Sequence, residues 1–191
     1  VRFLGVYLSN NNLSDNFWID RIQKLQSNLQ LWSRYNLTYQ GRVFAVRAQA
    51  LGSLTFQGRH NIIPPQHLKS IDSVIKNFIK KGKQKFIINY NIAKLPPDLG
   101  GINAPDIKLH FQTTQLSVLR FLLDPQYDSD VKPLIFYYLN NLCNFPDLDD
   151  NIFRYRNLLP RTSRSQFLPY VITLFHKLGG AVDPPERQHL T

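Results

Sequence analysis

The strongest constraint on the fold is an apolar stripe at helical spacing near the start of the chain. Its members are Trp18, Ile22, Leu25, Leu29 and Trp32. Successive members are three or four residues apart, and side chains at these intervals lie on one face of an α-helix. Ser14 or Asp15 is placed to cap the first turn. The pattern therefore predicts an amphipathic helix over residues 16–37 that buries one face.

Two further stripes follow, over residues 41–58 and 65–81. Their apolar members are Val43, Val46, Ala50, Leu51 and Leu54 in the first and Leu68, Ile71, Ile75 and Phe78 in the second. Pro64-Pro65 interrupts the chain between them, and Gly82 is placed to end the later one. Three amphipathic helices with short connections predict a small helical bundle.

The rest of the chain predicts more helices and little sheet. Residues 3–8 are apolar and include Val6 and Tyr7, which predicts one short strand, and Phe86-Ile87-Ile88 predicts another within 85–89. Helices are expected over 105–123, 131–143 and 165–178, and a disordered tail over 179–191. The expected fold class is mainly α: a three-helix bundle followed by further helices, with one or two short strands.

The net charge of +10 is confined to the first half of the sequence. Residues 1–90 hold 13 Lys and Arg against three Asp, whereas residues 91–191 hold 10 basic and 10 acidic residues. A one-sided excess of positive charge is typical of proteins that bind a polyanion such as nucleic acid. The alternative is a basic face that only keeps the protein in solution.

The candidate phosphate-binding residues are Lys and Arg on or beside the first three predicted helices. They are Arg21, Lys24, Arg34, Arg42, Arg47, Lys76, Lys80, Lys81, Lys83 and Lys85. Nucleic-acid binding requires several such cations on one surface. The same residues are also compatible with a solvated helix face, and Lys80 and Lys81 would favour the end of a helix through its dipole.

The two tryptophans and the pair Gly41-Arg42 can be explained by packing as well as by contact with nucleic acid. Trp18 and Trp32 belong to the apolar stripe, so we expect them in the core rather than stacked on bases. Gly41 permits a sharp turn before the second helix. Arg42 then either caps the bundle, packs against it, or reaches a phosphate.

The sequence predicts neither a metal site nor a catalytic centre. Cys143 is the only cysteine, and none of the five histidines has another at the third or fourth position along. The acidic runs Tyr127-Asp128-Ser129-Asp130 and Asp147-Leu148-Asp149-Asp150 lack flanking strands and a third carboxylate, so we interpret them as turns. No apolar run approaches the length of a membrane span, and no membrane partner is expected.

Four short motifs occur in a fixed order. They are Phe3-Leu4-Gly5-Val6-Tyr7-Leu8, then Leu31-Trp32-Ser33 with Gly41-Arg42, then Phe78-Ile79-Lys80-Lys81-Gly82-Lys83, then Gly100-Gly101-Ile102 with Pro105-Asp106. In this order they resemble the segment that follows the polymerase palm in LINE-type (non-LTR retrotransposon) reverse transcriptases. The resemblance covers residues 1–120, and Lys80 departs from it by replacing the usual Trp.

The resemblance implies a division of the chain and a role. Residues 1–12 look like the last palm strand and its turn, 13–90 like the helical thumb, and 91–125 like the connection; 126–178 is a helical region without an assigned role. A thumb of this kind grips the RNA–DNA duplex through backbone phosphates. The implied partners are RNA, DNA and the palm and fingers of the same polymerase, in the nucleus and cytoplasm. The divalent metal and the catalytic Asp pair would belong to the palm, so no activity is expected from this chain alone.

Other functions are compatible with the same residues. They are a stand-alone helical module that binds nucleic acid, a module that binds an acidic protein, and a degenerate copy of an element without function. Because the sequence begins at Val1 and contains no Met, we also expect it to be an internal fragment of a longer protein or the product of a truncated gene model.

Overall fold

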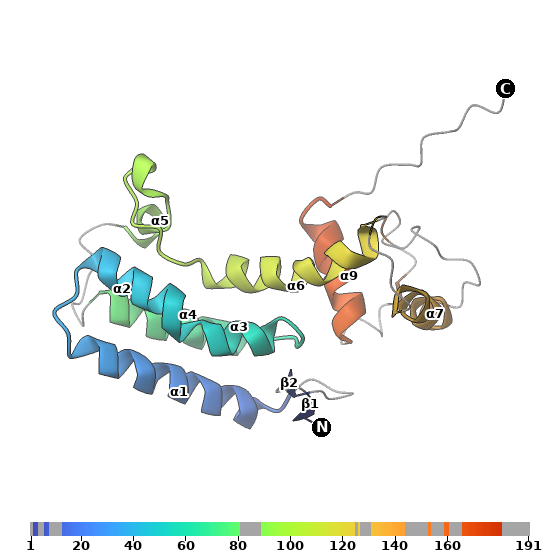
Figure 1. Ribbon diagram of the computed structural model, residues 1–191, viewed down its shortest axis with the longest axis horizontal. Coiled ribbons are helices and arrows are strands. Elements are labelled where there is room, and N and C mark those ends of the chain that lie inside the picture. The colour runs from blue at the N-terminus through green and yellow to red at the C-terminus, as the bar shows by residue number, and fades with distance from the viewer. Residues whose placement is uncertain are drawn as a thin grey trace. The chain divides into compact units, whose positions relative to one another are not determined.

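The computed structural model describes residues 2–3, 6–7, 13–80, 89–124, 126, 131–143, 153, 159–160 and 166–180. Over these residues the protein is mainly helical, which confirms the predicted fold class (Figure 1). The contacts divide the chain into two compact units, Val1–Thr114 and Gln115–Thr191. This division differs from the sequence-based one at residues 90 and 125, because a single hydrophobic core includes side chains from Trp18 to Phe111.

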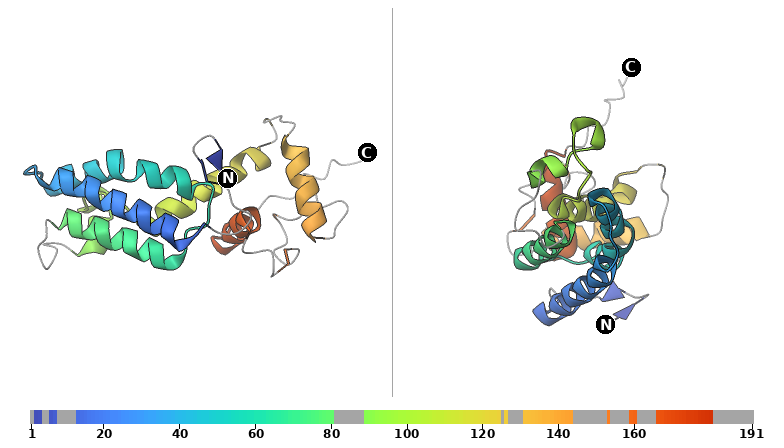
Figure 2. Two further views of the ribbon diagram at one scale, coloured as in Figure 1. Left: turned by 90° about the horizontal axis from the view of Figure 1, so that it is seen from below. Right: turned by 90° about the vertical axis from the view of Figure 1, so that its left-hand side faces the viewer.

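The first unit contains most of the helices. They are α1 (Asp15–Ser33), α2 (Tyr39–Ala45), the π-helix η1 (Val46–Ala50), α3 (Gly52–Gly58), α4 (Pro65–Ile79), α5 (Tyr90–Ala93), the 3₁₀ helix η2 (Pro97–Leu99) and the first part of α6 (Ile107–Leu123). Both views of the molecule show α1, the α2–α3 segment and α4 packed side by side (Figures 1 and 2). This is the bundle that the three apolar stripes predict.

The helices α1 and α4 run parallel, and the α2–α3 segment runs back antiparallel to both. At one end, Asp15 Oδ1 in the first turn of α1 lies 2.7 Å from Nε2 of the buried His67 in the first turn of α4. At the other end, Arg42 in α2 donates to the carbonyl of Phe78 in the last turn of α4. The bundle therefore gathers the C-terminal ends of α1 and α4 beside the start of α2.

The helix α1 forms as its stripe predicts. Trp18, Leu25 and Leu29 are buried, and Trp32 is half-buried against the same core. Ser14 Oγ accepts the N–H of Phe17 and so caps the first turn. The helix ends at Ser33 and not at residue 37. The predicted position of both tryptophans in the core is confirmed.

The predicted helix over 41–58 is interrupted by a π-helix. Thr38 Oγ1 accepts the N–H of Gly41, which starts α2 at Tyr39. The N–H of Leu51 then bonds to the carbonyl of Val46, five residues back and not four. A π segment inserts one extra residue into a helix and is frequent at functional sites.

The predicted strand over 3–8 is replaced by a small hairpin. Arg2–Phe3 (β1) pairs antiparallel with Val6–Tyr7 (β2), in the register Arg2 to Tyr7 and Phe3 to Val6. The structure thus has two short strands, paired with each other, where the sequence predicts one. Of the other predicted strand, residues 85–88 lie outside the described residues, and Asn89 caps α5 by accepting the N–H of Asn91.

The segment between α5 and α6 folds back on α5 as a tight loop. The N–H groups of Ile102 and Ala104 both donate to the carbonyl of Ala93, at 3.1 and 2.8 Å. Gly100 and Asn103 adopt left-handed backbone conformations, with φ of 80° and 56°. Asp106 Oδ1 then accepts the N–H of Leu109 and caps α6. The helix expected over 105–123 is confirmed, and it begins at Ile107, directly after Asp106.

The second unit has its own core. It is built from Leu119 and Leu122 of α6, Leu139 of α7 (Val131–Cys143), Phe153, Leu159, and Val171 and Ile172 of α9 (Phe167–Lys177). The structure confirms the helix predicted over 131–143. It also confirms the helix predicted over 165–178, which begins two residues later and ends one residue earlier than predicted. Of the expected tail, residues 181–191 lie outside the described part of the chain.

Candidate nucleic-acid interface

The few carboxylates of residues 1–90 are all engaged locally. Asp20 lies 3.0 Å from the ammonium of Lys24, and Asp72 lies 2.5 Å from that of Lys76. Asp15 contacts His67 and also accepts a hydrogen bond from Gln66. These contacts leave no carboxylate from this half of the chain to neutralise its remaining cations. The excess positive charge is therefore a property of the folded bundle and not only of the sequence.

The candidates on α1 differ in exposure. The Arg21 guanidinium lies over the Phe17 ring, 5.2 Å from its centroid, and the side chain is half-buried. Lys24 is exposed, and its ion pair with Asp20 contributes little to stability in water. Arg34, at the C-terminal end of the helix, is exposed. Lys24 and Arg34 are thus the exposed members of this group.

Arg42 is a correction to the predicted set, because it belongs to the core. Only 2% of its surface is exposed. Its Nη1 donates to the Phe78 carbonyl at 2.7 Å, its Nε donates to the Leu37 carbonyl at 3.4 Å, and the guanidinium lies over the Phe78 ring. Burial lowers the pKa of Arg42, and Tyr39 partly offsets this effect. A cation at the C-terminal end of α4 also interacts favourably with the helix dipole. Of the interpretations left open by the sequence, these contacts support the cap.

The remaining candidates lie on two other faces. Arg47, on the π-helix, is exposed and donates to Asn103 Oδ1 at 2.9 Å. Lys76 and Lys80 are half-buried at the end of α4, where Lys80 forms the C-cap. Lys81, Lys83 and Lys85 lie outside the described residues. The structure brings Arg34, Lys76 and Lys80 to one end of the bundle, while Arg47 faces the loop before α6.

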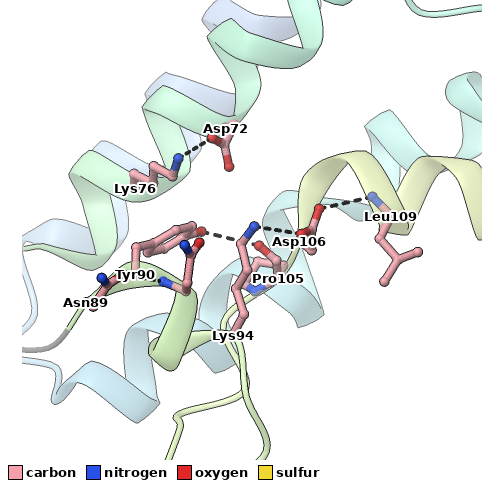
Figure 3. A network of polar contacts seen from close by, with 9 residues as sticks. Asp72, Lys76, Asn89, Tyr90, Lys94, Pro105, Asp106 and Leu109 are labelled. Atoms are coloured by element: carbon pink, nitrogen blue, oxygen red, sulfur yellow. Dashed lines mark hydrogen bonds and ion pairs between the residues drawn. The ribbon is translucent and has the colours of Figure 1, made fainter.

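The end of α4 is tied to α5 and α6 through Tyr90 (Figure 3). The ammonium groups of Lys76 and Lys94 lie 4.7 and 5.5 Å from the centroid of its ring, and its hydroxyl donates to the Pro105 carbonyl. Lys94 also donates to Asp106 Oδ2 at 2.6 Å. Burial raises the pKa of Tyr90, and Asp72 and Asp106 raise it further. Tyr90 therefore remains a neutral phenol that holds two cations in place.

Asp106 remains ionised in this network. Burial by itself raises the pKa of the carboxyl group, but hydrogen bonds from Lys94 and from the N–H of Leu109 outweigh it, so the net pKa is lowered. The pair of Lys94 and Asp106 is consequently a charged one at neutral pH. It joins α5 to the first turn of α6 within the first unit.

Two hollows lie beside the cations of the first unit. One, of about 480 Å³, runs between α1 and α4 with Arg42 in its wall, and its polar lining is made of Gln26, Gln30, Ser33 and Asn77. The other, of about 520 Å³, is lined by Arg47, Leu51, Lys94, Asn103, Ala104, Pro105, Asp106, Leu109, His110 and Thr113. We call the second hollow the Arg47 cleft.

Sequence reasoning missed Lys94, Asn103 and His110 as companions of Arg47. They lie 47 to 63 residues further along the chain, on α5, the following loop and α6. No local pattern marks them, because only the folded loop between α5 and α6 brings them to the π-helix.

Among the residues that the structure describes, no three His, Cys, Asp or Glu side chains meet in a way that could hold a metal ion. None of the described helices combines the length and apolar character needed to cross a membrane. Comparisons of the chain with protein-family models, curated proteins and solved structures found no match.

Proposed function

We propose that residues 13–125 act as the thumb and connection of a LINE-type reverse transcriptase and grip the RNA–DNA template–primer duplex during reverse transcription. The observation that carries this proposal is the positive charge of residues 1–90. This segment contains 13 Lys and Arg but only three Asp, and each Asp already contacts a Lys or His side chain. A helical bundle with exposed cations such as Lys24, Arg34 and Arg47 is consistent with a thumb. The order of the four sequence motifs supports the family.

Binding would be electrostatic and independent of base sequence. Lys24 is exposed on α1 and Arg34 is exposed at the C-terminal end of the same helix, so a duplex that lies along α1 would be held at more than one phosphate. Phosphate contacts fix position and orientation but carry no sequence information, and a polymerase has to accept every template. The partners are then RNA, DNA and the palm and fingers of the polymerase, in the nucleus and cytoplasm, and the catalytic step belongs to the palm.

Charge reversal on α1 should weaken binding of the full chain to an RNA–DNA hybrid. The double variant Lys24→Glu/Arg34→Glu changes two exposed side chains. We expect at least a tenfold loss of affinity near physiological salt and a slope of log affinity against log salt that is shallower by about 2, since each lost phosphate contact removes about 0.9. Fluorescence anisotropy of a labelled hybrid measures both quantities.

The matched control is Arg120→Glu/Lys177→Glu, which changes two exposed cations outside the first unit. Both double variants have the same net charge, so a difference between them reports location and not overall charge. Equal affinities for the two variants would count against the bundle as the binding surface. Circular dichroism checks that each variant keeps its helices.

A further inference from the structure

The Arg47 cleft gathers polar groups from three separate elements. The π-helix supplies Arg47, α5 supplies Lys94, and the start of α6 supplies Asp106 and His110. All of them belong to the first unit. Arg47 is the charged residue of the π-helix, and its side chain reaches Asn103 in the loop before α6. Figure 3 shows Lys94 and Asp106 meeting at the first turn of α6.

The balance of charge in the cleft favours a singly charged anion. Asp106 is engaged by Lys94 and by the N–H of Leu109, so its charge is locally compensated. Arg47 contacts the neutral amide of Asn103. Burial and, to a smaller extent, the Arg47 cation lower the pKa of His110, whose Nε2 lies 2.7 Å from Thr55 Oγ1, so this side chain adds no charge at neutral pH. Two cations and one carboxylate leave one net positive charge.

The guanidinium of Arg47 has further N–H donors that can bind such an anion. An Arg side chain carries five N–H donors, and within the described part of the chain Arg47 donates one hydrogen bond, to Asn103. Arg47 and Asn103 are exposed at the rim, whereas Lys94 and His110 are half-buried further in. An oxygen anion can therefore approach Arg47 from solvent and meet polar groups on the inner wall.

The cleft also has an apolar side and room for more than an ion. Leu109 is 53% exposed, although it is a large apolar residue, and it lines the cleft together with the buried Ala104 and Pro105. The volume of about 520 Å³ falls within the range of about 300 to 1,000 Å³ that is usual for small-molecule sites. A free phosphate would leave both the apolar wall and most of this volume unused.

We propose that the Arg47 cleft binds one nucleotide unit of a nucleic-acid strand, with its phosphodiester at Arg47 and Lys94 and its sugar against Leu109. A phosphodiester carries a single negative charge, which matches the net charge of the cleft. The identity of the ligand as nucleic acid rests on the proposed function. The cleft adds to it a discrete site, at which the strand is held by more than long-range attraction.

The probe is the dinucleoside monophosphate UpU, which has a single phosphodiester, titrated into the full chain and followed by NMR. We expect saturable shifts of the Arg47 Nε–H and Asn103 side-chain amide signals. Inorganic phosphate, titrated in parallel, should bind at least tenfold more weakly because it cannot use Leu109. Absence of UpU-dependent shifts at these groups, or equal binding of phosphate, would overturn the proposal.

Two substitutions with matched controls test the same site. Arg47→Gln removes the charge, and we expect it to weaken UpU binding about tenfold or more, as for the loss of a charge-assisted hydrogen bond. Leu109→Glu places a carboxylate on an exposed wall and should abolish UpU binding. The controls are Arg59→Gln and Leu99→Glu, which make the same changes at exposed positions of the first unit outside the cleft. UpU affinity equal to that of the wild type in both cleft variants would contradict the site.

The two proposals fail separately. If the wild type binds an RNA–DNA hybrid but UpU does not bind at the cleft, the proposed nucleotide site is contradicted and the proposed thumb function is not. If UpU binds at the cleft but the hybrid does not bind, the thumb function is wrong and the cleft is a site for single nucleotides.

Discussion

Replacement of Gly101 by alanine should lower the free energy of unfolding of the first unit by more than about 3 kcal/mol, which is at the top of the range for overpacked sites. A Cβ atom at this position would lie 1.9 Å from the carbonyl oxygen of Leu95 and 2.7 Å from that of Ile92. Both are backbone atoms. They cannot withdraw easily, because the Leu95 carbonyl accepts the N–H of Asn103 and the Ile92 carbonyl accepts the N–H of Leu95. The glycine is thus required by close approach of two chain segments.

Urea unfolding followed by tryptophan fluorescence measures this effect. Trp18 and Trp32 are the only tryptophans of the chain, and both contact the core of the first unit, so the signal reports that unit alone. The control is Gly52→Ala, because a Cβ there meets nothing within 4 Å and Gly52 begins α3. It should stabilise the unit by up to about 1 kcal/mol. An unchanged midpoint for Gly101→Ala would contradict the loop packing.

Replacement of Arg42 by alanine should lower the free energy of unfolding of the first unit by about 2 to 4 kcal/mol. The change removes the donor to the Phe78 carbonyl, and a buried acceptor left without a partner costs about 1 to 3 kcal/mol. It also removes the buried hydrocarbon stem and the contact with the Phe78 ring. Arg42→Lys should recover part of the loss, since an ammonium reaches one carbonyl but cannot reproduce the planar contact over the ring.

Arg34→Ala provides the comparison for Arg42, because Arg34 is exposed and should change stability by less than about 0.5 kcal/mol. Equilibrium unfolding and hybrid binding should be measured on the same samples. A variant Arg42→Ala that keeps its stability but loses affinity for the hybrid would reverse the assignment. Arg42 would then be a phosphate contact and not a cap.

The parts of the fold that depend on local spacing could be predicted from the sequence. The stripe from Trp18 to Trp32 and the Pro64-Pro65 break define the bundle, because helical periodicity and proline geometry act within a few residues. The π-helix could not be predicted, since its extra residue leaves the apolar positions Val46 and Ala50 both buried. The hairpin at Arg2–Tyr7 was missed because the apolar run hides the reversal between its two strands.

The candidate site shows the same limit. The excess of positive charge can be counted from the sequence, but the role of each cation depends on contacts between residues that are distant along the chain. Arg42 is buried by α4, 36 residues away, and Arg47 meets Asn103, 56 residues away. Lys94 and His110 gave no local signal, because their place beside Arg47 depends on how the loop before α6 folds.

The most direct test of the central claim is the affinity of the full chain for an RNA–DNA hybrid across a salt series. If the cations of the first unit grip backbone phosphates, log affinity should fall linearly with log salt, by about 0.9 for each phosphate contacted, and hybrids of unrelated sequence should give the same line. A well-folded protein whose affinity is negligible at about 50 mM salt, or does not change up to about 200 mM, would contradict the account.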